Sequence, residues 1–466
     1  MSVQTEARIE RIVNGLLPDG GLRNQYAGEV SLAKRMKDYN TPGVSIAVIR
    51  DFKVEWARGY GVREAGKPDP VTETTLFQAG SISKPVFALA AMRLVQEGVV
   101  SLDEDVNDRL RTWHVPANGN WQPRVTLRQL LSHSAGLTVH GFPGYERTEQ
   151  LPSLVQILNG QPPAHTPPVR VNLVPGVQFR YSGGGTTVAQ LLVQELCEGK
   201  SFPDLMEQFI LAPAGLANST YAQPLPPHLH SAAAAAHPWK GRPVSGNWHV
   251  YPEMAAAGLW TTPSDLARLG TELQMVIKRC SNFPLTASTL TQMLVPPAWE
   301  RMGLGFFVDG EGQSARFGHG GSNEGFTARL TLYRHLGLGA AIMINSNEGS
   351  PMISEIERAI AREYEWPDYF PALRDAVSLP HELLARYAGS YRTRSGLQLS
   401  IVEKEGELLA QVQGQAPVRL LAESDTSFRM EAANAEITFG PKSDGEPVSL
   451  TFRQEGKSFL AERYGQ

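Results

Sequence analysis

The stretch from Phe77 to Gly98 constrains the fold most strongly, because it joins a free turn to a helix pattern that is apolar without interruption. Gly80 frees the turn, Ser81 begins the helix, and Pro85 falls in the first turn, where a missing N–H costs little. The pattern predicts a helix from Ser81 to just before Gly98. Its apolar positions are Val86, Phe87, Ala88, Leu89, Ala90, Ala91, Met92, Leu94 and Val95.

Ser81 and Lys84 stand three residues apart, so both side chains project from the same face of this helix. A serine hydroxyl is a weak nucleophile until a neighbour takes its proton, and a partly buried lysine with a lowered pKa can be that base. The helix N-terminus also favours the negative charge that develops in acyl transfer. Taken alone, the four residues from Ser81 to Lys84 are better explained by a serine N-cap followed by a solvated lysine. The rest of the chain must therefore decide whether they are catalytic.

The composition is that of an ordinary globular protein, with 466 residues of which 42% are hydrophobic and 19% charged. A net charge of −4 without any basic run gives no sign of a nucleic-acid or membrane partner. No apolar window approaches the roughly eighteen residues of a membrane span, and no signal-like segment is visible. We expect a cytoplasmic location, or a periplasmic one if a signal was removed. Cys197 and Cys280 are expected to be buried free thiols, with a single disulfide as the alternative.

The order of the expected elements predicts an α/β domain that carries a helical subdomain. Two strand patterns precede the Ser81 helix, and residues 100–260, roughly, are mostly helix and loop. Strands return at 303–345, before a closing helix at 352–364. We expect this domain to span residues 1–370.

The composition changes at about Leu379, where short strands and turns begin to alternate. Strands at this spacing predict a small antiparallel barrel, closed or nearly closed, over residues 379–466. The segment holds no obvious chemical cluster. A role in packing, gating or oligomerisation is therefore favoured over a second active site.

Five stretches, in this order, are together far more specific than Ser81 and Lys84 alone. They are Phe77–Lys84, Thr126–Leu137, Phe179–Gly183, Ala256–Thr262 and Gly318–Gly321. With its S-x-x-K motif, the chain resembles the serine β-lactamase and penicillin-binding-protein superfamily, and within it the class C-like branch of esterases, D-amino-acid peptidases and related acyl-transfer enzymes. The resemblance covers about 40–365 and implies an antiparallel sheet flanked by helices, with an all-helical subdomain. The C-terminal part resembles the lipocalin-like modules attached to some members, including certain peptidases and stand-alone cyclising thioesterases.

The resemblance assigns roles to three side chains. Ser81 would be the acylated nucleophile and Lys84 its proton partner. Tyr181 matches the tyrosine of the family's Y-x-N motif, which shares general base and acid work with the lysine. Since a tyrosine with a pKa of about 10 needs nearby cations to ionise at neutral pH, Lys84 is expected to supply one.

The third family motif, K-T-G in many β-lactamases and H-x-G in esterase-like members, corresponds to His319, Gly320 and Gly321. The resemblance implies that its strand lines the active-site edge, where glycines permit close approach of the substrate. His319 would donate to the substrate or steady the catalytic side chains. The backbone N–H groups of Ser81 and Ser322 would form the oxyanion hole.

Two positions depart from the family's pattern. Gly183 replaces the asparagine of Y-x-N, which helps to hold the amide of a β-lactam or peptide. His319 replaces the lysine that usually helps to bind a β-lactam carboxylate. Both changes weaken the β-lactamase interpretation and favour an esterase or a specialised peptidase. Gly183, Gly320, Gly321 and Asn345 are the expected substrate-binding positions, and Asn345 follows the last core strand, where class C-like enzymes carry polar substrate-binding residues.

Other signals carry less weight. Ser132, His133 and Ser134 do not predict a catalytic triad, because adjacent side chains point apart and no acid is evident. We expect a structural turn beneath the active site there. His228 and His230 lack a carboxylate at metal-ligand spacing, so neither a metal nor a cofactor is expected.

The sequence therefore predicts a serine hydrolase that acts through an acyl-enzyme on small ester or amide substrates, with esters favoured. The alternatives are a D-amino-acid- or peptide-directed peptidase or acyltransferase, a β-lactamase, and a catalytically silent penicillin-recognising scaffold. The intact Ser81, Lys84 and Tyr181 argue against the silent scaffold. The acyl and leaving groups, the choice between hydrolysis and acyl transfer, and the oligomeric state, with a homo-oligomer among the options, stay open.

Overall fold

The structure is a computed structural model that describes residues 2–17, 30–297, 301–369, 377–394, 396–412, 415, 417–430, 435–443, 445–454 and 457–464. It forms two compact units, each with its own hydrophobic core. The larger unit takes in Leu32–Ile353, and the smaller unit takes in the C-terminal barrel.

A six-stranded antiparallel sheet organises the larger unit, in the strand order β2-β1-β8-β7-β6-β5. Strand β1 is buried along nearly its whole length because it pairs with β2 on one side and with β8 on the other. The sheet thus joins segments from both ends of this unit. Its strands are β1 (Gly43–Arg50), β2 (Lys53–Gly61), β5 (Phe307–Asp309), β6 (Arg316–Asn323), β7 (Phe326–Tyr333) and β8 (Gly339–Ile344).

The apolar helix pattern that follows Ser81 forms α3 (Ser83–Gln96), whose residues are almost all buried. A helix that is apolar on every side is stable only inside a core, and α3 lies in the main core of this unit. Ser81 lies just before α3, in a single 3₁₀ turn at Gly80–Ile82. The α-helix therefore begins at Ser83 and not at Ser81.

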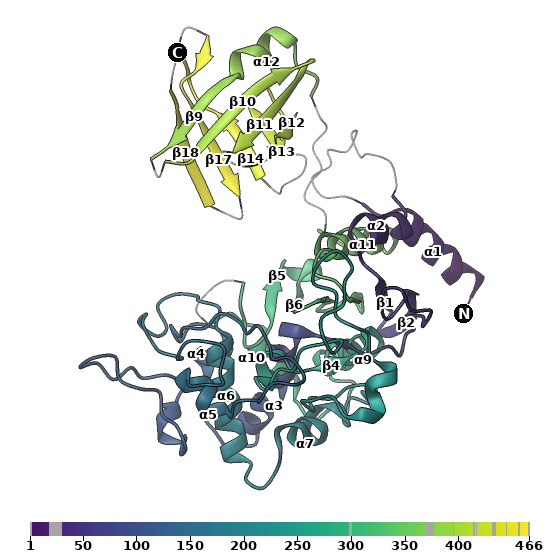
Figure 1. The fold of residues 1–466 in the computed structure, drawn as a ribbon, viewed down its shortest axis with the longest axis vertical. Helices are drawn as coiled ribbons and strands as arrows, with labels where there is room; N and C mark the ends of the chain where they lie inside the picture. Colours follow the sequence, from purple (N-terminus) through teal and green to yellow (C-terminus); the bar gives the residue numbers. More distant parts are fainter. Residues whose placement is uncertain are drawn as a thin grey trace. The chain divides into compact units, whose positions relative to one another are not determined.

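Helices flank the sheet. In Figure 1, α1 and α11 lie on one side of the sheet, whereas α3 and α9 lie on the other, where α9 packs against β1, β2 and β8. An ion pair between Arg11 and Glu363 ties α1 to α11. These helices, with two shorter ones, are α1 (Val3–Asn14), α2 (Leu32–Asp38), α9 (Pro263–Ile277), α10 (Ala287–Met293) and α11 (Ser350–Glu363).

A helical subdomain follows α3 and lies between two short paired strands, β3 (Phe77–Gln78) and β4 (Trp260–Thr261). Thr126 and Ser182 cap α4 and α6, each accepting an N–H group from the first turn of its helix. The sheet, its flanking helices and this subdomain confirm the predicted fold class. The helices of the subdomain are α4 (Leu127–Leu131), α5 (Leu154–Asn159), α6 (Gly183–Leu196), α7 (Phe202–Met206) and α8 (Met254–Ala257).

The smaller unit is a closed antiparallel barrel of eight strands, which confirms the predicted C-terminal barrel. Helix α12 (His381–Tyr387) precedes it, and the rings of Tyr387, Tyr391, Phe428 and Phe439 pack together in its core. The barrel strands are β9 (Gly389–Thr393), β10 (Gln398–Lys404), β11 (Glu407–Val412), β12 (Val418–Ala422), β13 (Ser427–Met430), β14 (Ala435–Phe439), β17 (Ser449–Gln454) and β18 (Lys457–Tyr464), and a small hairpin adds β15 (Lys442–Ser443) and β16 (Glu446–Pro447).

Both cysteines are free thiols, as expected, but neither is fully buried, so the predicted burial is wrong. Cys197 is half-buried, whereas Cys280 is exposed because α9 ends at Ile277 and the chain turns outward there. Among the residues that the structure describes, no helix is long and apolar enough to cross a membrane.

Candidate active site

Ser81 lies where the 3₁₀ turn before α3 meets strand β6. Gly80 has a φ of +52°, and a Cβ on it would lie 2.5 Å from the main-chain nitrogen of Ser322. A Cβ on Gly321 would lie 1.9 Å from the carbonyl oxygen of Ala79. Only glycine allows this close approach of two main chains, and at Gly80 only glycine adopts the conformation without strain. The approach brings the main chain of Ser81 against that of Ser322.

Lys84 connects the turn to the helical subdomain. Its Nζ donates to Ser81 Oγ at 3.0 Å and to the carbonyl oxygen of Ala256, in α8, at 2.8 Å. The side chain is only 4% exposed, and this burial lowers the pKa of Lys84 to about 7. At neutral pH a large fraction of Lys84 is therefore a neutral amine that can accept the hydroxyl proton of Ser81.

Tyr181 immediately precedes the cap of α6, and its phenol lies near the Ser81 hydroxyl. Burial raises the pKa of Tyr181 well above its usual range, and the neighbouring Ser81 offsets this only in part. Lys84 Nζ lies 5.0 Å from the ring centroid, over the face of the ring. The expectation that Lys84 promotes ionisation of Tyr181 is thus wrong, because desolvation dominates and keeps the phenol protonated.

His319 completes the group from strand β6, where it is 5% exposed. Its Nδ1 is bonded to the carbonyl oxygen of Gly320, so Nδ1 carries the proton, and Nε2 is a buried acceptor with no partner among the described residues. Burial, and next the charge of Lys84, lower the pKa of His319 to about 3. His319 is therefore a neutral imidazole whose Nε2 can accept a hydrogen bond, whereas the sequence led us to expect either a donor to the substrate or a residue that steadies Tyr181 and Lys84.

The comparison with known families now becomes informative. Residues 31–364 match the family described as Beta-lactamase, and residues 373–463 match a domain of unknown function, DUF3471. The chain belongs to the β-lactamase family. The predicted membership of the wider serine hydrolase superfamily is thereby confirmed.

Two relatives and one solved structure show what this chain is similar to. A β-lactamase of Pseudomonas fluorescens is 27% identical over 351 residues, which cover 67% of this chain and 90% of that protein. Protein Flp of Staphylococcus aureus strain N315 is 24% identical over 320 residues, 66% of this chain, and the match spans only 60% of Flp. The octameric penicillin-binding protein homologue from Pyrococcus abyssi has the same fold, with a TM-score of 0.62, 21% identity, and coverage of 92% of this chain and 98% of that one.

The position of the family's Y-x-N asparagine is filled differently here. A Cβ on Gly183 would lie 2.8 Å from the ring of Phe142 and 3.1 Å from the carbonyl oxygen of His140. The N–H of Gly183 also donates to that carbonyl at 3.0 Å. A loop of the helical subdomain thus covers Gly183, and a larger side chain would have to displace it.

Gly320 adjoins the group through its carbonyl oxygen, which accepts from His319 Nδ1, whereas the side chain of Asn345 bonds main chain elsewhere. A Cβ on Gly320 would find open space, with the nearest atom 3.9 Å away. Asn345 is fully buried; its Oδ1 accepts from Gly43 N at 2.7 Å, and its Nδ2 donates to Arg63 O at 2.9 Å. The amide of Asn345, just after β8, therefore links the start of β1 to the chain that follows β2.

Two histidines that the sequence analysis did not assign to the site contact Tyr181. The rings of His133 and His140 lie 4.3 Å and 5.0 Å from the Tyr181 ring, centroid to centroid. Phe307, from β5, stacks on the same ring at 6.5 Å. His133 lies in Thr126–Leu137, one of the five stretches that carry the family resemblance, so the sequence could have pointed to it. The side-chain contacts of His133, however, depend on how distant loops fold.

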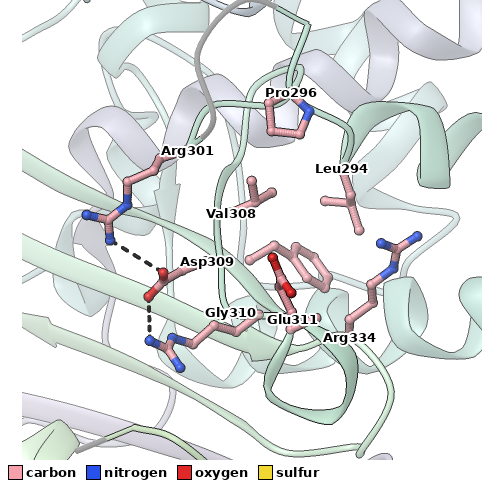
Figure 2. Close-up of a pocket in the computed structure, with 11 residues that line it drawn as sticks. Leu294, Pro296, Arg301, Val308, Asp309, Gly310, Glu311 and Arg334 are labelled. Carbon is pink, nitrogen blue, oxygen red and sulfur yellow. Dashed lines mark hydrogen bonds and ion pairs between the residues drawn. The ribbon is translucent and has the colours of Figure 1, made fainter. Parts of the chain in front are cut away.

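A cavity of about 580 Å³ lies beside β5, where Arg301 and Arg316 both pair with Asp309 (Figure 2). Neither Ser81 nor Lys84 lines it. Among the described residues, no three His, Cys, Asp or Glu side chains are grouped to hold a metal ion.

Proposed function

We propose that this protein is a serine hydrolase that forms an acyl-enzyme on Ser81 and acts by preference on small esters. The observation that carries the proposal is the contact between Ser81 Oγ and a buried Lys84 Nζ at 3.0 Å, with the pKa of Lys84 near 7. A neutral amine at hydrogen-bond distance is what a serine hydroxyl needs to become a nucleophile.

The proposed mechanism uses each group once in each half-reaction. Lys84 accepts the proton of Ser81 as Oγ bonds to the substrate carbonyl carbon. The oxyanion receives hydrogen bonds from the backbone N–H groups of Ser81 and Ser322. The bond to the leaving group then breaks, Tyr181 donates its proton to that group, and the proton on Lys84 restores the phenol. Water, or another acyl acceptor, enters by the reverse sequence.

Two features of the site support esters over amides and β-lactams. Phe142 and the main chain of His140 cover Gly183, so the amide-holding side chain of the Y-x-N motif has no counterpart here. His319 is neutral and buried, so it supplies no cation for a substrate carboxylate. A D-amino-acid-directed peptidase or acyltransferase remains the second candidate, favoured by the unpartnered Nε2 of His319, which can accept a hydrogen bond from an N–H group.

A substrate panel tests the proposal. Initial rates are measured on p-nitrophenyl esters, D-aminoacyl p-nitroanilides and a chromogenic cephalosporin, with Ser81→Ala as the control for background hydrolysis. We expect the highest kcat/KM on an ester and no turnover by Ser81→Ala. Fastest turnover of the cephalosporin would show that the argument from Gly183 and His319 is wrong.

We also propose that residues 379–466 form a lipocalin-like module that serves packing, gating or oligomerisation. The closed antiparallel barrel supports the comparison with lipocalins, and the octameric Pyrococcus abyssi homologue supports self-association. A cytoplasmic location and the domain boundary near residue 370 stay predictions. A silent scaffold is disfavoured because Lys84 is hydrogen-bonded to Ser81 and lies over the ring of Tyr181.

A further inference from the structure

His133 holds the main chain on both sides of Tyr181. Its carbonyl oxygen accepts from the N–H of Arg180 at 2.7 Å. Its ring Nδ1 accepts from the N–H of Ser182 at 3.2 Å. One residue therefore accepts hydrogen bonds from the N–H groups of both residues that flank Tyr181.

The ring of His133 also packs against the ring of Tyr181. Their centroids lie 4.3 Å apart with an angle of 34° between the planes. Phe179 meets the His133 ring edge-on at 6.1 Å, so the imidazole is held between two aromatic side chains. His133 is only 3% exposed, which leaves its ring little room to move.

The backbone of His133 is unusual. Its φ is +54°, in the left-handed region that a histidine adopts at a cost. Hydrogen bonds from Ser134 N to Gln129 O at 2.9 Å and from Ser132 Oγ to Arg128 O at 2.8 Å hold the turn in this conformation. The left-handed turn directs both the carbonyl oxygen and the ring of His133 toward the segment 180–182.

We propose that His133 is a positioning residue that holds the phenol of Tyr181 against Ser81, by stacking on its ring and by fixing the peptide groups on either side. The inference rests on the proposed function, in which Tyr181 donates the proton to the leaving group. His133 itself contacts neither Ser81 nor Lys84 through a hydrogen bond in the described structure.

The hydrogen bond from Ser182 fixes the tautomer of His133. Because Nδ1 accepts, the ring proton is on Nε2 and the imidazole is neutral. Burial, and the nearby Lys84, His319 and His140, lower the pKa of His133 well below its usual value. Protonation of Nδ1 would break the bond to Ser182, so the lowered pKa keeps the positioning contact intact across the working pH range.

Three substitutions separate the two contacts. His133→Asn keeps an acceptor near the position of Nδ1 and tolerates a left-handed backbone, but it loses the ring. His133→Phe keeps a ring and leaves the Ser182 N–H without its partner. His133→Gly removes both contacts and tolerates the backbone conformation. His335→Asn, in the exposed turn after β7, is the matched control.

The decisive experiment is a double-mutant cycle with Tyr181→Phe, measured as kcat and KM on an alkyl ester and on a p-nitrophenyl ester. In the parent background, His133→Gly is expected to lower kcat on the alkyl ester about 10- to 100-fold, with KM nearly unchanged. In the Tyr181→Phe background, the same change is expected to lower kcat less than about threefold, because the residue it positions is gone. The p-nitrophenyl ester, whose leaving group needs no proton, should lose less.

Partial rescue is expected for His133→Asn and His133→Phe. The kcat of each should lie between that of His133→Gly and that of the parent. Equal losses in both backgrounds would overturn the positioning role, as would an unchanged kcat in a folded His133→Gly protein. If His133→Gly does not fold, the cycle is run with His133→Asn. If Tyr181→Phe retains full activity, the proposed role of Tyr181 has failed instead, and this outcome is distinct from the failure of the positioning role.

Discussion

At the scale of single residues, the chemistry depends on one buried lysine. Lys84 lies among apolar neighbours of α3 and α8, where desolvation disfavours its charged form. Burial also raises the pKa of Tyr181, so the neutral amine of Lys84 is available near neutral pH while Tyr181 stays a phenol. The base is therefore Lys84, and Tyr181 is left as the acid.

This assignment predicts how activity depends on pH. The kcat/KM for a p-nitrophenyl ester should rise with pH through an apparent pKa of about 7 and level off above it, because only the neutral amine of Lys84 accepts the proton of Ser81. Initial rates measured from pH 5.5 to 9 check this. A rate that is constant across that range would contradict the assignment.

The burial of Lys84 also predicts a stability change of known sign. The pKa of Lys84 is about 7 in the folded protein and about 10.4 in the unfolded chain. Between these two pH values the unfolded chain binds more protons than the folded protein, so the parent protein becomes more stable as pH rises. Lys84→Met should therefore raise the free energy of unfolding by a few kcal/mol at pH 7, and this advantage should shrink toward pH 10. Denaturant unfolding at several pH values measures it. Lys67→Met, at an exposed lysine, serves as the control, and an advantage for Lys84→Met that is independent of pH would refute the argument.

At the scale of elements, the site depends on how closely the turn at Gly80–Ile82 approaches strand β6. The glycines Gly80 and Gly321 allow main chain to meet main chain, which brings together Ser81 and Ser322, the two residues proposed to bind the oxyanion through their N–H groups. The catalytic geometry is thus set by two elements far apart in sequence and joined through the sheet.

Gly80→Ala tests this approach. The new Cβ would lie 2.5 Å from Ser322 N on a backbone with positive φ, so the turn must move away from β6. We expect kcat to fall by roughly 10²- to 10³-fold, the loss typical of an oxyanion-hole donor. Gly98→Ala is the matched control, because Gly98 also has a positive φ (+72°) but no atom within 4 Å of its Cβ position. Equal kcat losses in the two variants would contradict the role of the approach.

The elements and motifs that the sequence predicts correctly are those set by local pattern. The apolar run before Gly98 and the strand alternation after Leu379 depend on neighbouring residues, so α3 and the barrel could be predicted. The contacts of His133 could not, because they form only when a turn after α4 meets the chain before α6. For the same reason, the hydrogen bond between the Asn345 amide and the main chain of Gly43, far away in sequence, could not be predicted.

At the scale of the whole molecule, the larger unit and the barrel each have a hydrophobic core. One core surrounds α3 and the sheet, and the other fills the barrel with aromatic rings such as Tyr387 and Phe439, whose centroids lie 4.2 Å apart. Because each core is built from its own set of side chains, we expect the two units to unfold in separate transitions.

Tyr387→Ala should therefore weaken one unit only. The substitution removes a fully buried ring and should cost about 3–5 kcal/mol of barrel stability. Calorimetry of the parent should show two transitions, of which Tyr387→Ala lowers one, while ester hydrolysis at 25 °C is retained. A single transition that shifts as a whole would contradict independent units.

Labelling with a fluorophosphonate tests the central claim most directly, with intact-protein mass spectrometry as the readout. The account predicts a single adduct on the parent at pH 8, located on Ser81, and none on Ser81→Ala. An adduct that persists in Ser81→Ala, or that maps to another serine, would contradict the claim that Lys84 activates Ser81 as the nucleophile.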